Sequence, residues 1–196
     1  LLKNFPLASI NISNIAVVNK VPFLGDTLYN ARELNLSLKI TELFKSANEV
    51  LELKNISTKN GQLNIIFNKE SVGNYDVAIK QETPVKTAVN SAPFSLNIQE
   101  YQLKNINFKY IDRGTHVMMS LDQINHLGTG NFAQEILDLD TKTTANLSLY
   151  LDNVNYLHDV AISLNAVLGI DLKTSKYTFK ENTGYINQLP LAFNGS

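Results

Sequence analysis

The stretch Leu34-Asn35-Leu36-Ser37-Leu38-Lys39-Ile40 alternates strictly between aliphatic and polar side chains. Successive side chains of a β-strand point to opposite faces, so this pattern predicts a strand with one apolar face and one polar face. Strands of this kind are typical of antiparallel sheets, because parallel strands are usually covered on both sides. The same alternation recurs in five further sets: Phe94, Leu96 and Ile98; Ile106, Phe108 and Tyr110; Leu147, Leu149 and Leu151; Val160, Ile162 and Leu164; Leu168, Ile170 and Leu172.

The alternation predicts an all-β fold: an elongated, curled antiparallel sheet or an open sandwich, with at most one or two short helices. Only residues Thr41 to Asn48 suggest a helix. Prolines and a scarcity of apolar residues predict a long loop over Gln81 to Pro93. Turns or bends are expected where glycine follows polar residues. These sites are Asn60-Gly61 as a hairpin dipeptide, Asp112-Arg113-Gly114, Gly128-Thr129-Gly130 and Asn182-Thr183-Gly184.

An internal repeat divides the chain. Leu53-Lys54-Asn55-Ile56 recurs as Leu103-Lys104-Asn105-Ile106, each after an alternating strand. This indicates a first β unit over residues 1–80, a loop or boundary at 81–93 and a second β unit over 94–196, which together form one continuous β domain. Two similar hairpins within one sandwich would produce the same spacing.

Composition excludes several classes of function. Of 196 residues, 44% are hydrophobic and 18% are charged, and the formal net charge of -1 provides no basic surface for nucleic acid. The absence of cysteine excludes disulfides and thiol chemistry, and no apolar run has the length of a membrane span. Because the chain begins and ends within strand patterns, we expect it to be part of a longer protein whose targeting and anchoring signals lie elsewhere.

The sequence contains no recognisable arrangement of catalytic residues. His116, His126 and His158 lack the spacing of a metal motif and are interpreted as surface or sheet-edge imidazoles. Asp138 and Asp140 alternate with leucines and fit the solvated side of a strand. No phosphate-binding loop or nucleophile motif is present in the sequence. We therefore expect no enzyme, no cofactor and no metal site.

Several strand motifs resemble the AsmA-like family of bacterial envelope proteins, particularly its Bacteroidota members. The motifs lie in both halves of the chain and cover most of it. They are Phe5 to Leu7, Asn11 to Ile15, Ala31 to Leu38, Leu43-Phe44, Leu51 to Phe67, Leu103 to Asp112, Ile124 to Phe132, Asp171 to Asn182 and Ile186 to Gly195.

The resemblance implies a periplasmic segment of a protein anchored in the inner membrane, acting in outer-membrane biogenesis. It also implies partners: phospholipid acyl chains, conducted along an apolar β groove, and other envelope proteins. The expected lipid-facing residues are the apolar members of the alternating strands. They are Leu34, Leu36, Leu38, Ile40, Phe94, Leu96, Ile98, Ile106, Phe108, Leu147, Leu149 and Leu151. The alternative is a structural or adhesive β-sandwich of the envelope with no ligand.

Overall fold

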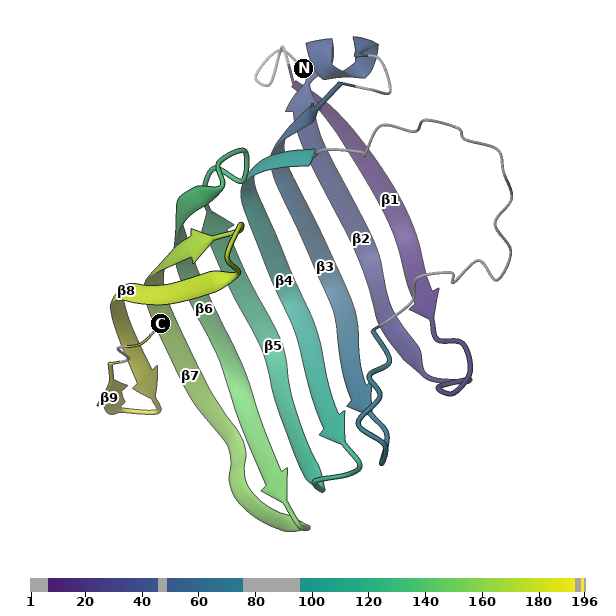
Figure 1. Ribbon diagram of the computed structural model, residues 1–196, viewed down its shortest axis with the longest axis vertical. Helices are drawn as coiled ribbons and strands as arrows, with labels where there is room; N and C mark the ends of the chain where they lie inside the picture. Colours follow the sequence, from purple (N-terminus) through teal and green to yellow (C-terminus); the bar gives the residue numbers. More distant parts are fainter. Residues whose placement is uncertain (1–6, 46–48, 76–95, 193–194, 196) are drawn as a thin grey trace.

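The chain forms one nine-stranded sheet whose strands follow one another in sequence order (Figure 1). The computed structural model describes residues 7–45, 49–75, 96–192 and 195. One short 3-10 helix, η1 (Ile40–Phe44), follows the second strand. The strands are β1 (Leu7–Val18), β2 (Thr27–Lys39), β3 (Leu51–Phe67), β4 (Leu96–Asp112), β5 (Val117–Thr129), β6 (Ile136–Leu151), β7 (Val154–Asp171), β8 (Lys176–Ile186) and β9 (Leu189–Leu191).

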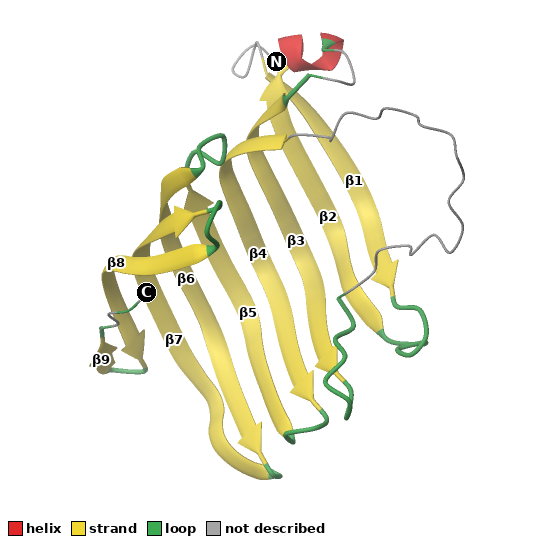
Figure 2. Ribbon diagram, viewed as in Figure 1, coloured by secondary structure: helices red, strands yellow, loops and turns green. Residues whose placement is uncertain are grey.

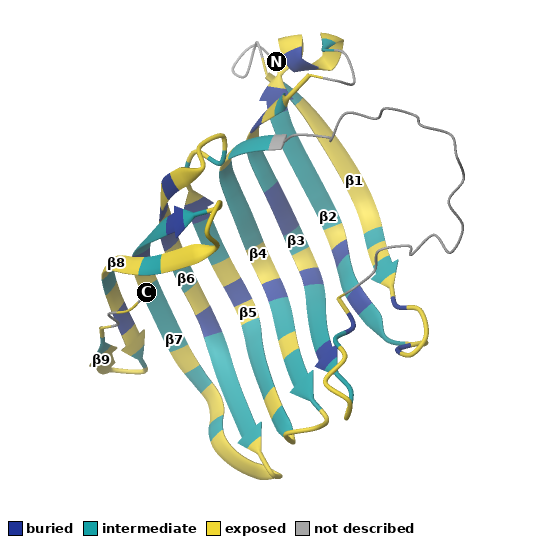
Figure 3. Ribbon diagram, in the orientation of Figure 1, coloured by how far each residue is buried: buried dark blue, intermediate teal, exposed yellow. Residues whose placement is uncertain are grey.

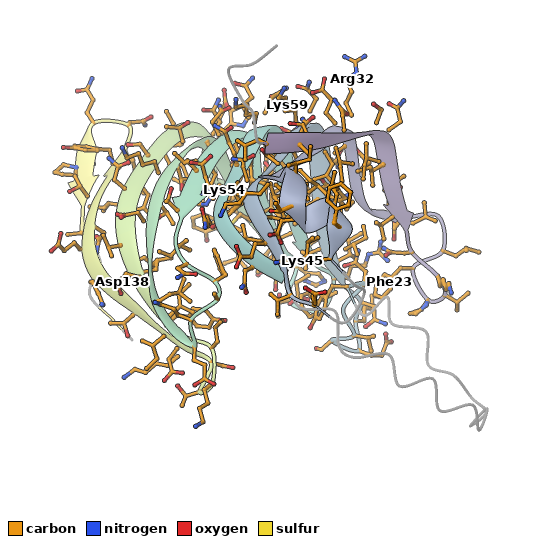
Figure 4. All side chains as sticks on the ribbon, turned by 90° about the horizontal axis from the view of Figure 1, so that it is seen from above. Phe23, Arg32, Lys45, Lys54, Lys59 and Asp138 are labelled. Carbon is orange, nitrogen blue, oxygen red and sulfur yellow. The ribbon has the colours of Figure 1, made fainter. Side chains whose placement is uncertain are left out.

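The sheet is a single curved layer and does not close into a barrel (Figure 2). Figure 4 looks along the long axis and shows the sheet bent into an arc, with Arg32 and Lys59 projecting from its outer side. Thr58 precedes Lys59 in β3, so its side chain points to the inner, concave side. The prediction of an all-β, curled and open sheet is confirmed.

One pair of strands departs from the antiparallel pattern. β3 and β4 run parallel over 15 paired positions, from Leu51 beside Leu96 to Phe67 beside Asp112. All other neighbouring strands are antiparallel. A parallel pair needs a long connection that returns the chain to the same end of the sheet. Here that connection lies between Phe67 and Leu96 and includes the Gln81 to Pro93 stretch, whose predicted loop falls outside the described residues.

The predicted hairpin turn at Asn60-Gly61 is wrong, because both residues lie in the middle of β3. Asn60 has the positive φ of 51° that such a turn requires, but it uses this conformation as an irregularity within a strand. Gly61 lies beside Ile106 of β4 and opposite Ala31 of β2. Asparagine tolerates the left-handed conformation in both settings, so the dipeptide alone does not distinguish them.

Asn60 belongs to a row of left-handed residues that crosses the sheet. Asn14, Asn60, Asn105, Gln123 and Asp159 all have φ between 51° and 56° and lie in β1, β3, β4, β5 and β7. Their polar groups bond to neighbouring strands: the Asn105 amide donates to Asn60 Oδ1 at 2.8 Å, and Asp159 N donates to Ser148 Oγ at 3.0 Å. Such irregularities bend strands, and this row accompanies the curvature of the sheet.

Some of the other local predictions are confirmed and others are wrong. Asp112-Arg113-Gly114 forms the expected turn, in which Asp112 Oδ1 accepts from the backbone N of Gly114 at 2.8 Å and of Thr115 at 3.0 Å. Gly128 and Thr129 end β5. The turn predicted at Asn182 to Gly184 is wrong, since these residues lie within β8. Where a helix was predicted over Thr41 to Asn48, the structure has the single-turn η1, and residues 46–48 lie outside the described part.

The repeated tetrapeptides occupy adjacent parallel strands but not equivalent places. Leu103 pairs with Thr58, five positions beyond Leu53. Asn60 rather than Asn55 is therefore the neighbour of Asn105, and only Asn60 and Asn105 of these three are left-handed. The first tetrapeptide is also followed by strand rather than by a turn. The sheet runs without interruption from the first unit to the second through the β3–β4 pair.

Candidate functional site: the concave face

The concave face carries the apolar core of the molecule. Ile106, Ile124 and Ala145, from β4, β5 and β6, are at most 8% exposed and form one cluster. The half-buried side chains that pack against it are Leu103, Phe108, Leu121 and Ile162. Leu103 pairs with Thr58 in the register of the parallel strands, which places this cluster on the inner side of the arc.

A second cluster continues the apolar surface toward one end of the sheet. Leu137 and Leu139 of β6 and Ile170 of β7 are at most 7% exposed. Partly buried Tyr101, Phe132 and Leu168 pack against them. Burial of this extent in a single layer results from curvature, which crowds side chains on the inner side. Figure 3 shows buried and half-buried positions along β2 to β7 and exposed positions along β1.

The left-handed residues keep the apolar side chains on one face. Leu103 and Ile106 are three residues apart, an odd spacing that would place them on opposite faces of a regular strand. Both nevertheless pack in the same cluster, because left-handed Asn105 between them shifts the alternation by one residue. In β5, Leu121 and Ile124 show the same shift around Gln123. A strictly period-two interpretation of the sequence cannot follow a face across such a residue.

The concave face is open to solvent in the part of the chain that the structure describes. Every described strand belongs to the one sheet, so no second layer of strands covers it there. Its large side chains, including Phe108, Leu121, Leu147 and Leu149, are only half-buried. We call this surface the trough: an apolar inner face bounded by the curvature of the sheet.

A small polar group interrupts the trough. His126 lies opposite Thr143, and its Nδ1 is 2.8 Å from Thr143 Oγ1 while its Nε2 is 2.9 Å from the Tyr101 hydroxyl. The Tyr101 ring stacks obliquely on the imidazole with centroids 5.2 Å apart and lies directly over Gly128. Burial lowers the pKa of His126 and raises that of Tyr101. Sequence reasoning interpreted His126 as a surface or sheet-edge imidazole, whereas it is half-buried within the sheet. It missed Tyr101 and Thr143 because the three residues come from three different strands.

His126 predicts a pH-dependent stability. Its pKa is lowered in the folded protein, so the unfolded chain binds the proton more readily and stability falls as pH decreases below the ordinary histidine value of about 6.5. We expect the urea midpoint to be lower at pH 5.5 than at pH 7.5. His126→Gln should remove most of that difference, and the same change at exposed His158 should leave it intact. An equal pH dependence in parent and His126→Gln would contradict this assignment.

The residues predicted to face lipid are distributed as follows. Leu34 and Leu36 are half-buried opposite Thr58 and Ile56, and Leu38 is 1% exposed opposite Leu53. The remaining described members lie in β4, β6 and η1. Ile106 is buried; Ile98, Phe108, Leu147 and Leu149 are half-buried; Leu151, at the end of β6, and Ile40, in η1 rather than in a strand, are exposed. Phe94 and the side chain of Leu96 fall outside the described residues.

The convex face carries hollows between its side chains. One hollow of about 530 Å³ is lined by residues of β5 to β8, and its charged groups are Asp140, Lys142 and Glu181. Asp138 and Asp140 are exposed and alternate with buried Leu137 and Leu139, as predicted from the sequence. His116 and His158 are exposed, and His116 Nδ1 lies 3.2 Å from Asp152 Oδ1.

Within the described residues, no group of three or more His, Asp and Glu side chains is placed to hold a metal ion. No helix among them is long and apolar enough to cross a membrane. Comparisons of the chain with models of protein families, with curated proteins and with solved structures found no match.

Proposed function

We propose that this chain is a lipid-handling module of the bacterial envelope, in which the trough binds the acyl chains of phospholipids. The observation that carries the proposal is a single curved sheet whose concave face is apolar across β2 to β7 and is left half-exposed. Burying a methylene group is favourable by about 0.8 kcal/mol, so a short stretch of acyl chain against this surface would bind measurably.

The resemblance to AsmA-like proteins gives the proposal its setting. We infer a periplasmic location, an anchor in the inner membrane outside this segment and a role in outer-membrane biogenesis alongside other envelope proteins. Phospholipid would then lie along the trough, with its acyl chains on the side chains of the first cluster. The alternative role, a structural or adhesive envelope module, needs no ligand in the trough.

Site-specific photocrosslinking separates these two roles. A photoreactive residue at Phe108, which is half-buried in the trough, should form adducts with phospholipid in bacterial envelopes. The matched control is the next residue, Lys109, which is exposed on the convex face. We expect lipid adducts, identified by mass spectrometry, at position 108 and not at 109. Absence of adducts at 108, or equal yields at both positions, would favour the structural role.

A further inference from the structure

β1 is an edge strand without the usual protection. It pairs with β2 on one side and, within the described residues, with no strand on the other. Natural edge strands are commonly protected against pairing by charged residues, by proline or by being short. β1 is 12 residues long, Leu7 to Val18, and contains neither a charged residue nor a proline. Its irregularities are left-handed Asn14 and a shift of the register with β2 between Val17 and Val18.

The apolar side chains of β1 continue the trough and are left exposed at this edge. Ile10 pairs with Leu36 and Ile12 with Leu34, and beyond Asn14, Ile15 pairs with Ala31. Ile10 is 41% exposed and Ile12 is 42% exposed, whereas their partners in β2, which have neighbours on both sides, are half-buried. A strand added beside β1 would cover both isoleucines.

The sequence of β1 is close to a palindrome around its irregular residue. It reads Ile10-Asn11-Ile12-Ser13-Asn14-Ile15-Ala16-Val17. When two copies run antiparallel with Ser13 beside Asn14, Ile12 faces Ile15 and Ile10 faces Val17, each pair on the concave side. The two left-handed Asn14 residues then lie one position apart, each beside Ser13 of the other copy. Within one chain, Asn14 lies opposite Arg32, between the Ser13–Glu33 and Ile15–Ala31 pairs.

We propose that β1 is an interaction surface for a second copy of this chain, which pairs with it antiparallel, edge to edge, in this register. The arrangement is self-complementary: each β1 supplies the same apolar residues, and no charge opposes the approach. Two sheets joined in this way form one sheet of twice the width with a shared concave face. The inference rests on β1 alone and does not depend on lipid binding.

Paired charge substitutions at exposed convex positions test this register. Asn11 of one copy would face Ala16 of the other, and within one chain these residues face Asn35 and Asn30. In the double variant Asn11→Lys, Ala16→Lys, a lysine of one copy faces a lysine of the other at two places across the dimer. In Asn11→Asp with Ala16→Lys, each pair is opposite in charge. Sedimentation equilibrium should give a dissociation constant of the dimer that is about tenfold higher than the parent's for the first variant and no higher than the parent's for the second.

A chain that remains monomeric at its highest soluble concentration, or the same dissociation constant for both variants, would overturn the proposal. Because the described chain contains no cysteine, a disulfide gives an independent measurement. Mixed Asn11→Cys and Ala16→Cys chains should oxidise to a cross-linked heterodimer, whereas Asn11→Cys alone should not cross-link. Equal cross-linking in both samples would refute this register. Equal urea midpoints for all variants would show that each remains folded.

Discussion

Replacing Gly61 with alanine is expected to destabilise the protein by about 2–3 kcal/mol, the cost of forcing extra volume into a packed site. Gly61 is buried in the middle of β3, directly opposite Ala31 of β2. A Cβ atom at position 61 would overlap the backbone carbonyl oxygen of Asn30 and approach the Ala31 Cβ to 3.0 Å. A backbone oxygen held in a sheet cannot rotate away, so β2 and β3 would have to separate.

Urea unfolding measures this effect, and Gly114→Ala is the matched control. Gly114 is exposed in the turn after β4, where an added Cβ would lie 3.3 Å from Asp112 Oδ1 as its nearest neighbour. That change should alter the free energy of unfolding by no more than about 0.5 kcal/mol. If Gly61→Ala unfolds at the parent's midpoint, the close approach of β2 to β3 at this position is refuted, and with it the central placement of Asn60-Gly61.

The position of Asn60-Gly61 shows how far sequence reasoning reaches in this protein. Alternation identified strands such as Leu34 to Lys39 because period two is a local property of the chain. It could not show that Asn60-Gly61 lies inside one strand of 17 residues, β3. The same left-handed conformation occurs in hairpin turns and in irregularities within strands. Telling them apart requires the neighbouring strand, here Asn105 of β4.

The pairing of the strands and the polar group of the trough could not be predicted from the sequence for a related reason. The parallel β3–β4 pair joins residues 45 positions apart, such as Leu63 and Phe108, across the long connection between Phe67 and Leu96. His126 meets Tyr101 and Thr143 only through the register of β4, β5 and β6. These contacts depend on long-range pairing, whereas the apolar members of the trough follow from local spacing only within each regular stretch of strand.

A lysine at Leu149 should reduce the phospholipid bound to the protein by about tenfold, roughly the loss of two buried methylene groups. Leu149 is half-buried on the concave face, between Met119 of β5 and Leu157 of β7. A lysine there can extend its ammonium group into solvent and preserve the sheet while placing charge in the trough. The proposal of lipid binding therefore predicts a loss of ligand that exceeds any loss of stability.

The neighbouring residue supplies the control for this prediction. Tyr150 is also half-buried but points to the convex face, where it lies with Ile111 and Met118. Lipids extracted from equal amounts of purified parent, Leu149→Lys and Tyr150→Lys should be quantified by mass spectrometry, with urea midpoints measured on the same samples. Loss of lipid in Leu149→Lys alone, with both variants folded, supports acyl-chain binding in the trough. Equal lipid content in all three samples would exclude this part of the trough as a binding surface, because a charge placed there would then leave the ligand undisturbed.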